Sequence, residues 1–288
     1  MWLLAIDGGA TKTQARLLNT GTGQQWQQLS GPASVNNDLA GALRTVRQLI
    51  TRLCAEAGVT SGQLIAAMGL AGAGNSGLHQ QFCQQLDIPL HKLLLTTDAR
   101  TSLYGANLGK PVVVVALGTG SVAMQLDNKL AEHQFGGWGF SIGDEGGGAW
   151  LGKQAVKQLL NEFDSLTGIH SQLATRLSKQ LGHQRPALLH WLKNAQAHDY
   201  AALTPQIFEL APDCPQASRL IQLHRAAVIE LIQISRAGTD LPVILLGGLA
   251  AVTRPLLGDY YSPWLQDARG NALDGAILLA RQLAAEEK

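Results

Sequence analysis

A glycine turn that carries a carboxylate, two hydroxyls and an ammonium follows directly behind the first apolar segment of the chain. Segment 2–6 reads Trp-Leu-Leu-Ala-Ile, and the next residues are Asp7, Gly8, Gly9, Ala10, Thr11, Lys12 and Thr13. Because residues 14–18 are strand-like again, we expect a hairpin. Its glycines can aim backbone N–H groups at an anion, and Asp7 can hold Mg²⁺ directly or through water. The turn suits a triphosphate and its metal, although structural glycine turns between strands are common.

The same arrangement occurs a second time in the chain. An apolar segment at 112–117 leads into Gly118, Thr119, Gly120 and Ser121, and another strand-like segment follows at 122–126. Two coincidental turns are the alternative, but their separation corresponds to the size of a domain. We therefore favour two lobes whose turns hold one nucleotide.

Phosphoryl transfer also needs a carboxylate that orients and deprotonates the accepting hydroxyl. Asp98 is the best candidate, because it lies between an apolar strand at 93–97 and a helix expected at 98–108. Ligand contacts in parallel α/β sheets gather at such carboxyl ends of strands. The alternative is that Asp98 only caps the following helix, which would be the preferred interpretation of an isolated aspartate. Because the same chain carries two phosphate-type turns, we favour the catalytic interpretation.

A glycine-dense stretch at 136–148 carries groups that suit a sugar. It includes Gly136, Gly137, Trp138, Asp144 and Glu145. Adjacent carboxylates and exposed N–H groups can bind a polyol, and a tryptophan offers a flat apolar surface to a sugar ring. An equally weighted alternative is a flexible loop with solvated charges and a tryptophan packed in the core.

Two further segments are candidates for ligand contacts. Asn36 lies in a polar cluster at 34–38, where one residue is expected to cap the following helix, and its side chain can instead bind sugar hydroxyls. Gly247 and Gly248 follow an apolar strand at 241–246. They suit a close approach to adenine or ribose, or form an ordinary strand-to-helix connection.

Alternating strands and helices are expected to position these groups. In the first hundred residues, strand-like and helical patterns alternate at 2–6, 14–18, 39–53, 63–70, 78–86, 93–97 and 98–108. Such an α/β pattern predicts a sheet with parallel strands and helical cover. A Gly-Lys-Pro break at 109–111 precedes the second hairpin. We therefore predict an N-terminal lobe at 1–110 and a C-terminal lobe at 111–288, with a helical insertion at about 149–236.

The composition is typical of a globular protein and disfavours several classes. The 288 residues are 46% apolar and 15% charged, with a formal net charge of +1. No basic run indicates nucleic acid, and no apolar stretch approaches the ~18 residues that span a bilayer. Six residues precede Asp7, too few for a signal peptide, and the three cysteines form no Cys-x-x-Cys pair. We expect a cytoplasmic protein without a structural metal, nucleic-acid partner or membrane partner.

Five short motifs together resemble a known family. They are Asp7-Gly8-Gly9-x-Thr11, Thr97-Asp98-Ala99, Gly118-Thr119-Gly120-Ser121, Gly136-Gly137-Trp138-Gly139 and Gly143-Asp144-Glu145-Gly146. Their order is that of N-acetylglucosamine kinases, in the BadF/BadG/BcrA/BcrD-type ATPase family of the actin-like ATPase superfamily. The stretch 199–208 is similar to bacterial glucosamine kinases. Each motif is generic by itself, and the five in order are specific.

This resemblance implies two ribonuclease-H-like lobes with a central cleft for ATP and an amino sugar. It implies phosphorylation of the sugar 6-hydroxyl with Asp98 as the base and Mg²⁺ placed by Asp7. N-acetylglucosamine is the expected substrate, with glucosamine as the alternative, and a homodimer is compatible with the family. The implied phosphate contacts are Gly8, Gly9, Thr11, Lys12, Gly118, Thr119, Gly120 and Ser121. The implied adenosine contacts are Gly247 and Gly248, and the sugar contacts are Asn36, Asp98, Gly136, Gly137, Trp138 and Asp144.

Two rival functions fit the same fold. An activator ATPase would need cysteines near glycine turns for an iron–sulfur cluster, whereas Cys54 and Cys83 lie in helical patterns. A non-catalytic sugar sensor is expected to have lost a catalytic carboxylate, whereas Asp7, Asp98 and Asp144 are all present. The sequence therefore favours an enzyme.

Overall fold

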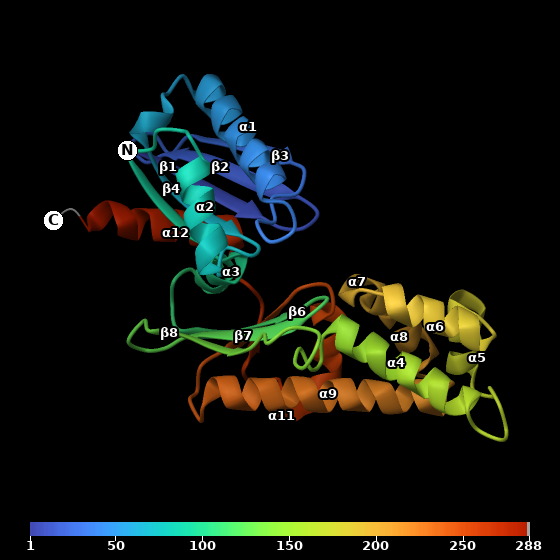
Figure 1. Cartoon of the computed structure of the whole chain (residues 1–288). Coiled ribbons are helices and arrows are strands. Elements are labelled where there is room, and N and C mark those ends of the chain that lie inside the picture. Colours follow the sequence, from blue (N-terminus) through green and yellow to red (C-terminus); the bar gives the residue numbers. More distant parts are fainter. Residues whose placement is uncertain (287–288) are drawn as a thin grey trace. The chain divides into compact units, whose positions relative to one another are not determined.

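The computed structural model describes residues 1–286, which form two compact units (Figure 1). The first unit contains Met1–Val112, Leu126–Ala131 and the described residues from Asp267 onwards, and the second contains Val113–Gln125 and Glu132–Gln266. The sequence predicted a C-terminal lobe at residues 111–288. The structure instead groups the last helix, α12 (Ala272–Ala285), with the first unit.

The first unit is built on a five-stranded sheet of order β3-β2-β1-β4-β5. Its strands are β1 (Trp2–Gly8), β2 (Thr13–Asn19), β3 (Gln25–Ser30), β4 (Leu64–Leu70) and β5 (Lys92–Thr96). β1, β2 and β3 pair antiparallel, whereas β1, β4 and β5 pair parallel. The carboxyl ends of the three parallel strands therefore meet at one edge of the sheet.

Helices cover both faces of this first sheet (Figure 1). They are α1 (Leu39–Ala57), the short η1 (Ser61–Gln63), α2 (Ser76–Gln85), α3 (Asp98–Ala106) and α12. α1 places its apolar stripe in the core that also holds Leu4, Ile6 and Leu17 of the sheet. α12 packs on α3 and β1, and Asp274 in its first turn forms an ion pair of 2.5 Å with Arg16 of β2. These contacts explain why the end of the chain returns to the first unit.

The second unit is built on a five-stranded sheet of order β8-β7-β6-β9-β10. This is the order of the first sheet: the first strand of the unit lies in the centre, its second and third strands lie on one side, and its fourth and fifth lie on the other. Its strands are β6 (Val112–Leu117), β7 (Ser121–Leu126), β8 (Glu132–Gly136), β9 (Val243–Leu246) and β10 (Leu265–Gln266). β6 pairs parallel with β9, and β9 pairs parallel with β10. In each unit a first hairpin is thus extended by strands from later in the chain.

The helices of the second unit gather into two packing regions. They are α4 (Gly148–Phe163), α5 (Gln172–Leu181), α6 (Arg185–Asn194), α7 (Ala197–Ala201), α8 (Thr204–Leu210), α9 (Pro215–Arg236), α10 (Ala250–Thr253), η2 (Arg254–Leu257) and α11 (Gly258–Tyr261). Val228 and Ile232 of α9 pack on Val113, Val115 and Leu117 of the sheet. The first part of α9 and helices α4 to α8 form a separate helical core. None of the helices within residues 1–286 has the length and apolar character needed to cross a bilayer.

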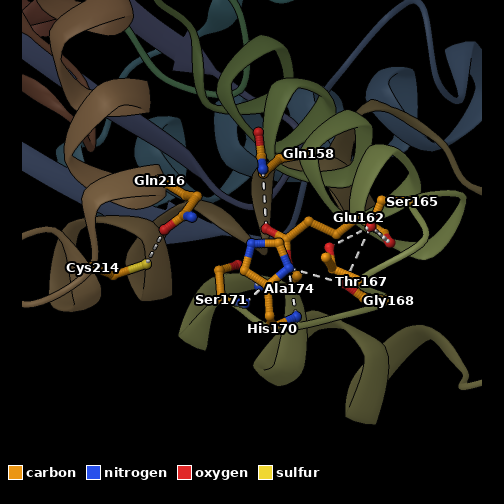
Figure 2. Close-up of polar contacts among 10 residues, drawn as sticks. All are labelled: Gln158, Glu162, Ser165, Thr167, Gly168, His170, Ser171, Ala174, Cys214 and Gln216. Carbon is orange, nitrogen blue, oxygen red and sulfur yellow. Dashed lines mark hydrogen bonds and ion pairs between the residues drawn. The ribbon is translucent and has the colours of Figure 1, made fainter.

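A buried carboxylate fastens the loop between α4 and α5 (Figure 2). Glu162 accepts hydrogen bonds from the N–H groups of His170 and Ser171, at 3.0 and 2.9 Å, and from Gln158 Nε2 at 3.0 Å. Burial opposes its ionisation, but the hydrogen bonds from Ser171, Gln158 and His170 outweigh burial and lower the pKa of Glu162 to about 2. The charged side chain therefore stabilises the fold.

Replacing Glu162 with glutamine is expected to lower the free energy of unfolding at pH 7 by about 2 to 3 kcal/mol. Since the folded-state pKa is depressed, this stabilisation is fully present above the ordinary pKa of 4.5 and is lost as the pH falls towards 2. Urea unfolding of the wild type and E162Q from pH 7 to pH 3 should show the gap narrowing. The exposed Glu209, which pairs with Arg176 at 2.8 Å, supplies a matched control, and E209Q should change stability by less than about 1 kcal/mol. A pH-independent gap would contradict this account.

Candidate active site

Residues 9–12 form the turn of the β1–β2 hairpin in the first unit. The N–H of Gly9 donates to the Lys12 carbonyl at 3.0 Å, which closes the turn. Thr13 is buried, and its hydroxyl donates to the Gly31 carbonyl at 2.7 Å. The side chains of Thr11 and Lys12 are exposed. Thr13 thus anchors the hairpin, and the anion-binding role of the exposed Thr11 and Lys12 stays a prediction.

Asp7 and Asp98 lie near the carboxyl ends of β1 and β5, at one edge of the sheet. The hydroxyl of Thr97 accepts the N–H of Arg100 at 3.2 Å, so Thr97 caps α3 and Asp98 is left for another role. Burial, followed by repulsion from Asp98, raises the pKa of Asp7 to about 6, and the charge of Lys12 opposes this rise. The two carboxylates are therefore close enough to interact, as a cation site or a proton-accepting site requires.

Asp98 is itself held in a partly buried position. Its Oδ1 accepts the N–H of Ala99 at 3.0 Å. Burial raises the pKa of Asp98 above its ordinary value, although this hydrogen bond opposes the rise. A desolvated carboxylate with one fixed oxygen is suited to orienting a hydroxyl and accepting its proton.

Asn36 lies at the same edge of the first unit, in the loop between β3 and α1. Asp38 is the residue of the polar cluster that caps α1, and this leaves Asn36 exposed. The N–H of Val35 donates to the Ala71 carbonyl at 2.8 Å, and the N–H of Ala71 donates to the Gly8 carbonyl at 2.8 Å. The loop that carries Asn36 is therefore tied to the end of β1, where the first phosphate-type turn begins.

In the second unit, residues 118–120 join β6 to β7 and lie against the N-terminus of α4. The N–H groups of Gly148 and Ala149 donate to the carbonyls of Gly118 and Thr119, both at 2.8 Å. This fixes the turn on the first residues of a 16-residue helix. The carbonyls of the turn thus pair with N–H groups that the first turn of a helix leaves without intrahelical partners.

Ser121 differs from the expectation that it contacts phosphate. It is buried, and its hydroxyl donates to the Glu145 carbonyl at 2.7 Å. The sequence suggested a phosphate contact because this serine ends a glycine turn. Its hydroxyl instead binds the glycine-rich loop to the start of β7. The phosphate contacts expected of Gly118, Thr119 and Gly120 stay a prediction.

Asp144 lies directly beside the second phosphate-type turn. The N–H of Gly139 donates to Asp144 Oδ1 at 3.1 Å, and a Cβ placed on Gly120 would lie 2.3 Å from Asp144 Oδ2. Burial raises the pKa of Asp144, the N–H groups of Gly139 and Ser121 oppose this rise, and Glu145 adds to it. The structure thus brings a predicted sugar contact next to a predicted phosphate contact.

Gly247 and Gly248 lie next to the end of β6. Gly247 has φ of +93°, and a Cβ on it would lie 2.3 Å from the Leu117 carbonyl oxygen. The N–H of Leu249 donates to that same carbonyl at 3.0 Å. The segment 247–249 therefore packs on the residue that precedes Gly118, and the predicted adenosine and phosphate contacts of the second unit are neighbours.

A cavity of about 550 Å³ brings together the sugar-contact candidates of the second unit. Trp138 is 82% exposed, which excludes the alternative that it packs in the core. The cavity is lined by Ser121, Gln134, Phe135, Gly136, Gly137, Trp138, Asp144, Glu145, Ala227, Glu230, Leu231 and Ile234. Four predicted substrate contacts, Gly136, Gly137, Trp138 and Asp144, thus share one concave surface.

The sequence did not predict that residues of α9 line one side of this cavity. Ala227, Leu231 and Ile234 recur at helical spacing and line the cavity with Glu230. Apolar residues at that spacing are also typical of a helix packing on a core. The sequence alone could not separate the two uses.

Comparison with known proteins places the chain in a family. The model of the BadF/BadG/BcrA/BcrD ATPase family matches residues 4–258. The chain belongs to this ATPase family. The ATPase is 29% identical over 286 residues to the protein named glucosamine kinase from Vibrio cholerae serotype O1, covering 97% of this chain and 95% of that relative. It is 26% identical over 277 residues to the N-acetyl-D-glucosamine kinase of Dictyostelium discoideum, covering 85% and 84%.

Among solved structures, the ATPase matches a provisionally assigned N-acetylglucosamine kinase from Chromobacterium violaceum. The TM-score is 0.86 and the identity 29%, over 97% of this chain and 98% of the other. This match, with two mixed sheets of the same strand order, confirms the predicted two-lobed, actin-like α/β fold. ATP is the nucleotide of the family to which the chain belongs.

Proposed function

We propose that this ATPase transfers the γ-phosphoryl group of ATP to the 6-hydroxyl of an amino sugar. The observation that carries this proposal is Asp98, a partly buried carboxylate that does not cap α3 and that lies near enough to Asp7 to raise the pKa of Asp7, at the edge that bears the first phosphate-type turn. The relatives named glucosamine kinase and N-acetyl-D-glucosamine kinase, each matched over most of the chain, support the same reaction. A protein built for sugar sensing alone would not need this pair of carboxylates.

Two substrates are supported by different features of the cavity. Trp138, Leu231 and Ile234 offer apolar surface to an N-acetyl methyl group, which favours N-acetylglucosamine. Asp144, Glu145 and Glu230 offer negative charge to the ammonium of glucosamine. The match to the relative named glucosamine kinase covers 97% of this chain. Glucosamine is therefore the second candidate substrate.

The protein's own groups perform three tasks in this reaction. Asp98 orients the sugar hydroxyl and accepts its proton late in the transfer. Lys12 and the N–H groups of the first turn offset the charge that spreads over the transferring phosphoryl group. Asn36 of the first unit, and Trp138 and Asp144 of the second, are the proposed sugar contacts of their own units.

Asp7 fits a role in placing Mg²⁺. In residues 1–286 no group of three or more His, Cys, Asp or Glu side chains is arranged to hold a metal. Mg²⁺ is often held by one or two carboxylates together with substrate phosphates, so a single carboxylate such as Asp7 can contribute to its site. Since burial and Asp98 both disfavour its charge, Asp7 would gain from a nearby cation. When bound, Mg²⁺ would neutralise phosphate charge.

Replacing Asp7 with asparagine is expected to raise the Mg²⁺ concentration for half-maximal activity by about tenfold or more, because one anionic ligand is lost. A magnesium titration at saturating ATP measures this shift, and a chelator should abolish turnover. The fully exposed Asp240 provides a matched control in D240N. An unchanged magnesium requirement in D7N would remove Asp7 from the metal site.

A coupled assay of ADP release across hexoses and amino sugars tests the function itself. We expect N-acetylglucosamine or glucosamine to support turnover with a kcat/KM at least about tenfold above that of glucose. Equal turnover with and without any sugar would instead indicate ATP hydrolysis without transfer to a sugar, and the amino-sugar proposal would be wrong.

A further inference from the structure

His224 is a buried histidine of α9 that has no part in the chemistry above. Its Nε2 lies 2.8 Å from the hydroxyl oxygen of Thr253, and both side chains are inaccessible to solvent. Thr253 ends α10, and its N–H donates to the Leu249 carbonyl at 3.0 Å. One side of the ring is thus tied to the segment that follows Gly247 and Gly248.

The other side of the ring faces the glycine-rich loop. Nδ1 of His224 is buried and has no hydrogen-bond partner within the described part of the chain. Gly146 packs against Ala227 and Val228, within one helical turn of His224, since a Cβ on Gly146 would lie 3.6 Å from Ala227 Cβ and 3.5 Å from the Val228 nitrogen. Burial lowers the pKa of His224, and the backbone of Gly146 opposes this shift. A neutral ring protonated at Nδ1 would direct that proton towards Gly146 and accept the Thr253 hydroxyl proton at Nε2.

Gly146 and Gly147 connect this ring with the second phosphate-type turn. A Cβ on Gly146 would lie 2.9 Å from Val228 Cγ2, so the loop rests on α9 one turn beyond His224. A Cβ on Gly147 would lie 2.6 Å from the carbonyl carbon of Gly120. Because the loop packs closely against Val228 on one side and against Gly120 on the other, we expect a displacement of Gly146 to shift Gly120 as well.

We propose that His224 is a positioning residue for nucleotide binding. On one side, its ring supports the 118–120 turn through Gly146 and Gly147. On the other side, it supports the 247–249 segment through Thr253. Both segments are thereby held in a fixed position at the end of β6. The inference rests on the proposed nucleotide role of those two segments and needs no particular sugar. His224 acts through them and does not touch the ligand itself.

Nucleotide affinity in matched variants tests this proposal. His224→Phe keeps a ring of similar size and removes both polar contacts, and Thr253→Val removes the hydroxyl. We expect each to raise the Kd for a non-hydrolysable ATP analogue, measured by calorimetry, by about tenfold. The KM for ATP should rise in parallel, and the KM for the sugar should change by less than about threefold. Thr253→Ser restores the hydroxyl and should bind with wild-type affinity, as should His190→Phe at an exposed site of α6.

Three results would overturn the proposal. Wild-type nucleotide affinity in a folded His224→Phe protein is the first. If that variant does not fold by circular dichroism, the Thr253 pair decides, and equal affinity in Thr253→Val and Thr253→Ser is the second. A parallel loss of sugar and nucleotide affinity with a lowered Tm is the third, because it would indicate a purely structural role. A wild type that binds nucleotide and phosphorylates no sugar contradicts the kinase proposal alone.

Discussion

Asp98→Asn is expected to lower kcat of the kinase by about 10²- to 10⁴-fold, because the amide cannot accept the proton of the sugar hydroxyl. The asparagine keeps the size of the side chain and an oxygen that can accept the Ala99 N–H, which now bonds Oδ1 at 3.0 Å. Sugar binding should therefore partly survive, and nucleotide affinity should stay near that of the wild type. Single-turnover kinetics together with calorimetry separate these quantities.

The exposed Asp213 offers a control of the same chemistry, and D213N should retain wild-type turnover. Since repulsion from Asp98 contributes to the raised pKa of Asp7, D98N should also lower the pKa of Asp7 from its value of about 6. Carboxyl NMR in the two proteins measures that change. Wild-type turnover in D98N would assign the base to another residue.

Gly247→Ala is expected to raise the KM for ATP by at least about tenfold. The added Cβ would lie 2.3 Å from the Leu117 carbonyl oxygen, and the positive φ of +93° disfavours any L side chain. The backbone must shift at the residue preceding the second phosphate-type turn, so we expect both nucleotide affinity and Tm to fall. Thermal unfolding and ATP titration measure the two effects.

Gly248 provides the matched comparison, because a Cβ there meets no atom within 4 Å. G248A should keep the wild-type Tm, and its KM for ATP reports whether this residue itself faces the nucleotide. Equal Tm and equal KM in G247A and the wild type would show that the close approach at Leu117 does not position the turn.

The sequence was informative where one local pattern determines one structure. An apolar strand, a glycine turn and a second strand predicted both hairpins, and the alternation up to Asp98 predicted β1, β2, β4 and β5 of the first sheet. The order of five motifs predicted the family and the fold. These signals are short in range, so they do not depend on how the rest of the chain packs.

Other features depend on contacts that no local pattern reveals. The edge strand β3 alternates exposed and half-buried residues, most of them polar, and β10 has only two residues. α12 joins the first unit because it packs on α3 and pairs Asp274 with Arg16, 258 positions away in sequence. The commitment of the Ser121 hydroxyl to Glu145 likewise depends on tertiary packing.

The position of the transferred phosphate tests the central claim most directly. Phosphorus and proton NMR of the product from ATP and an amino sugar would show which oxygen carries it. The account predicts one ADP for each sugar phosphate, with the phosphate on the 6-oxygen, and no product from a 6-deoxy analogue. Release of inorganic phosphate, or phosphate on any other oxygen, would contradict it.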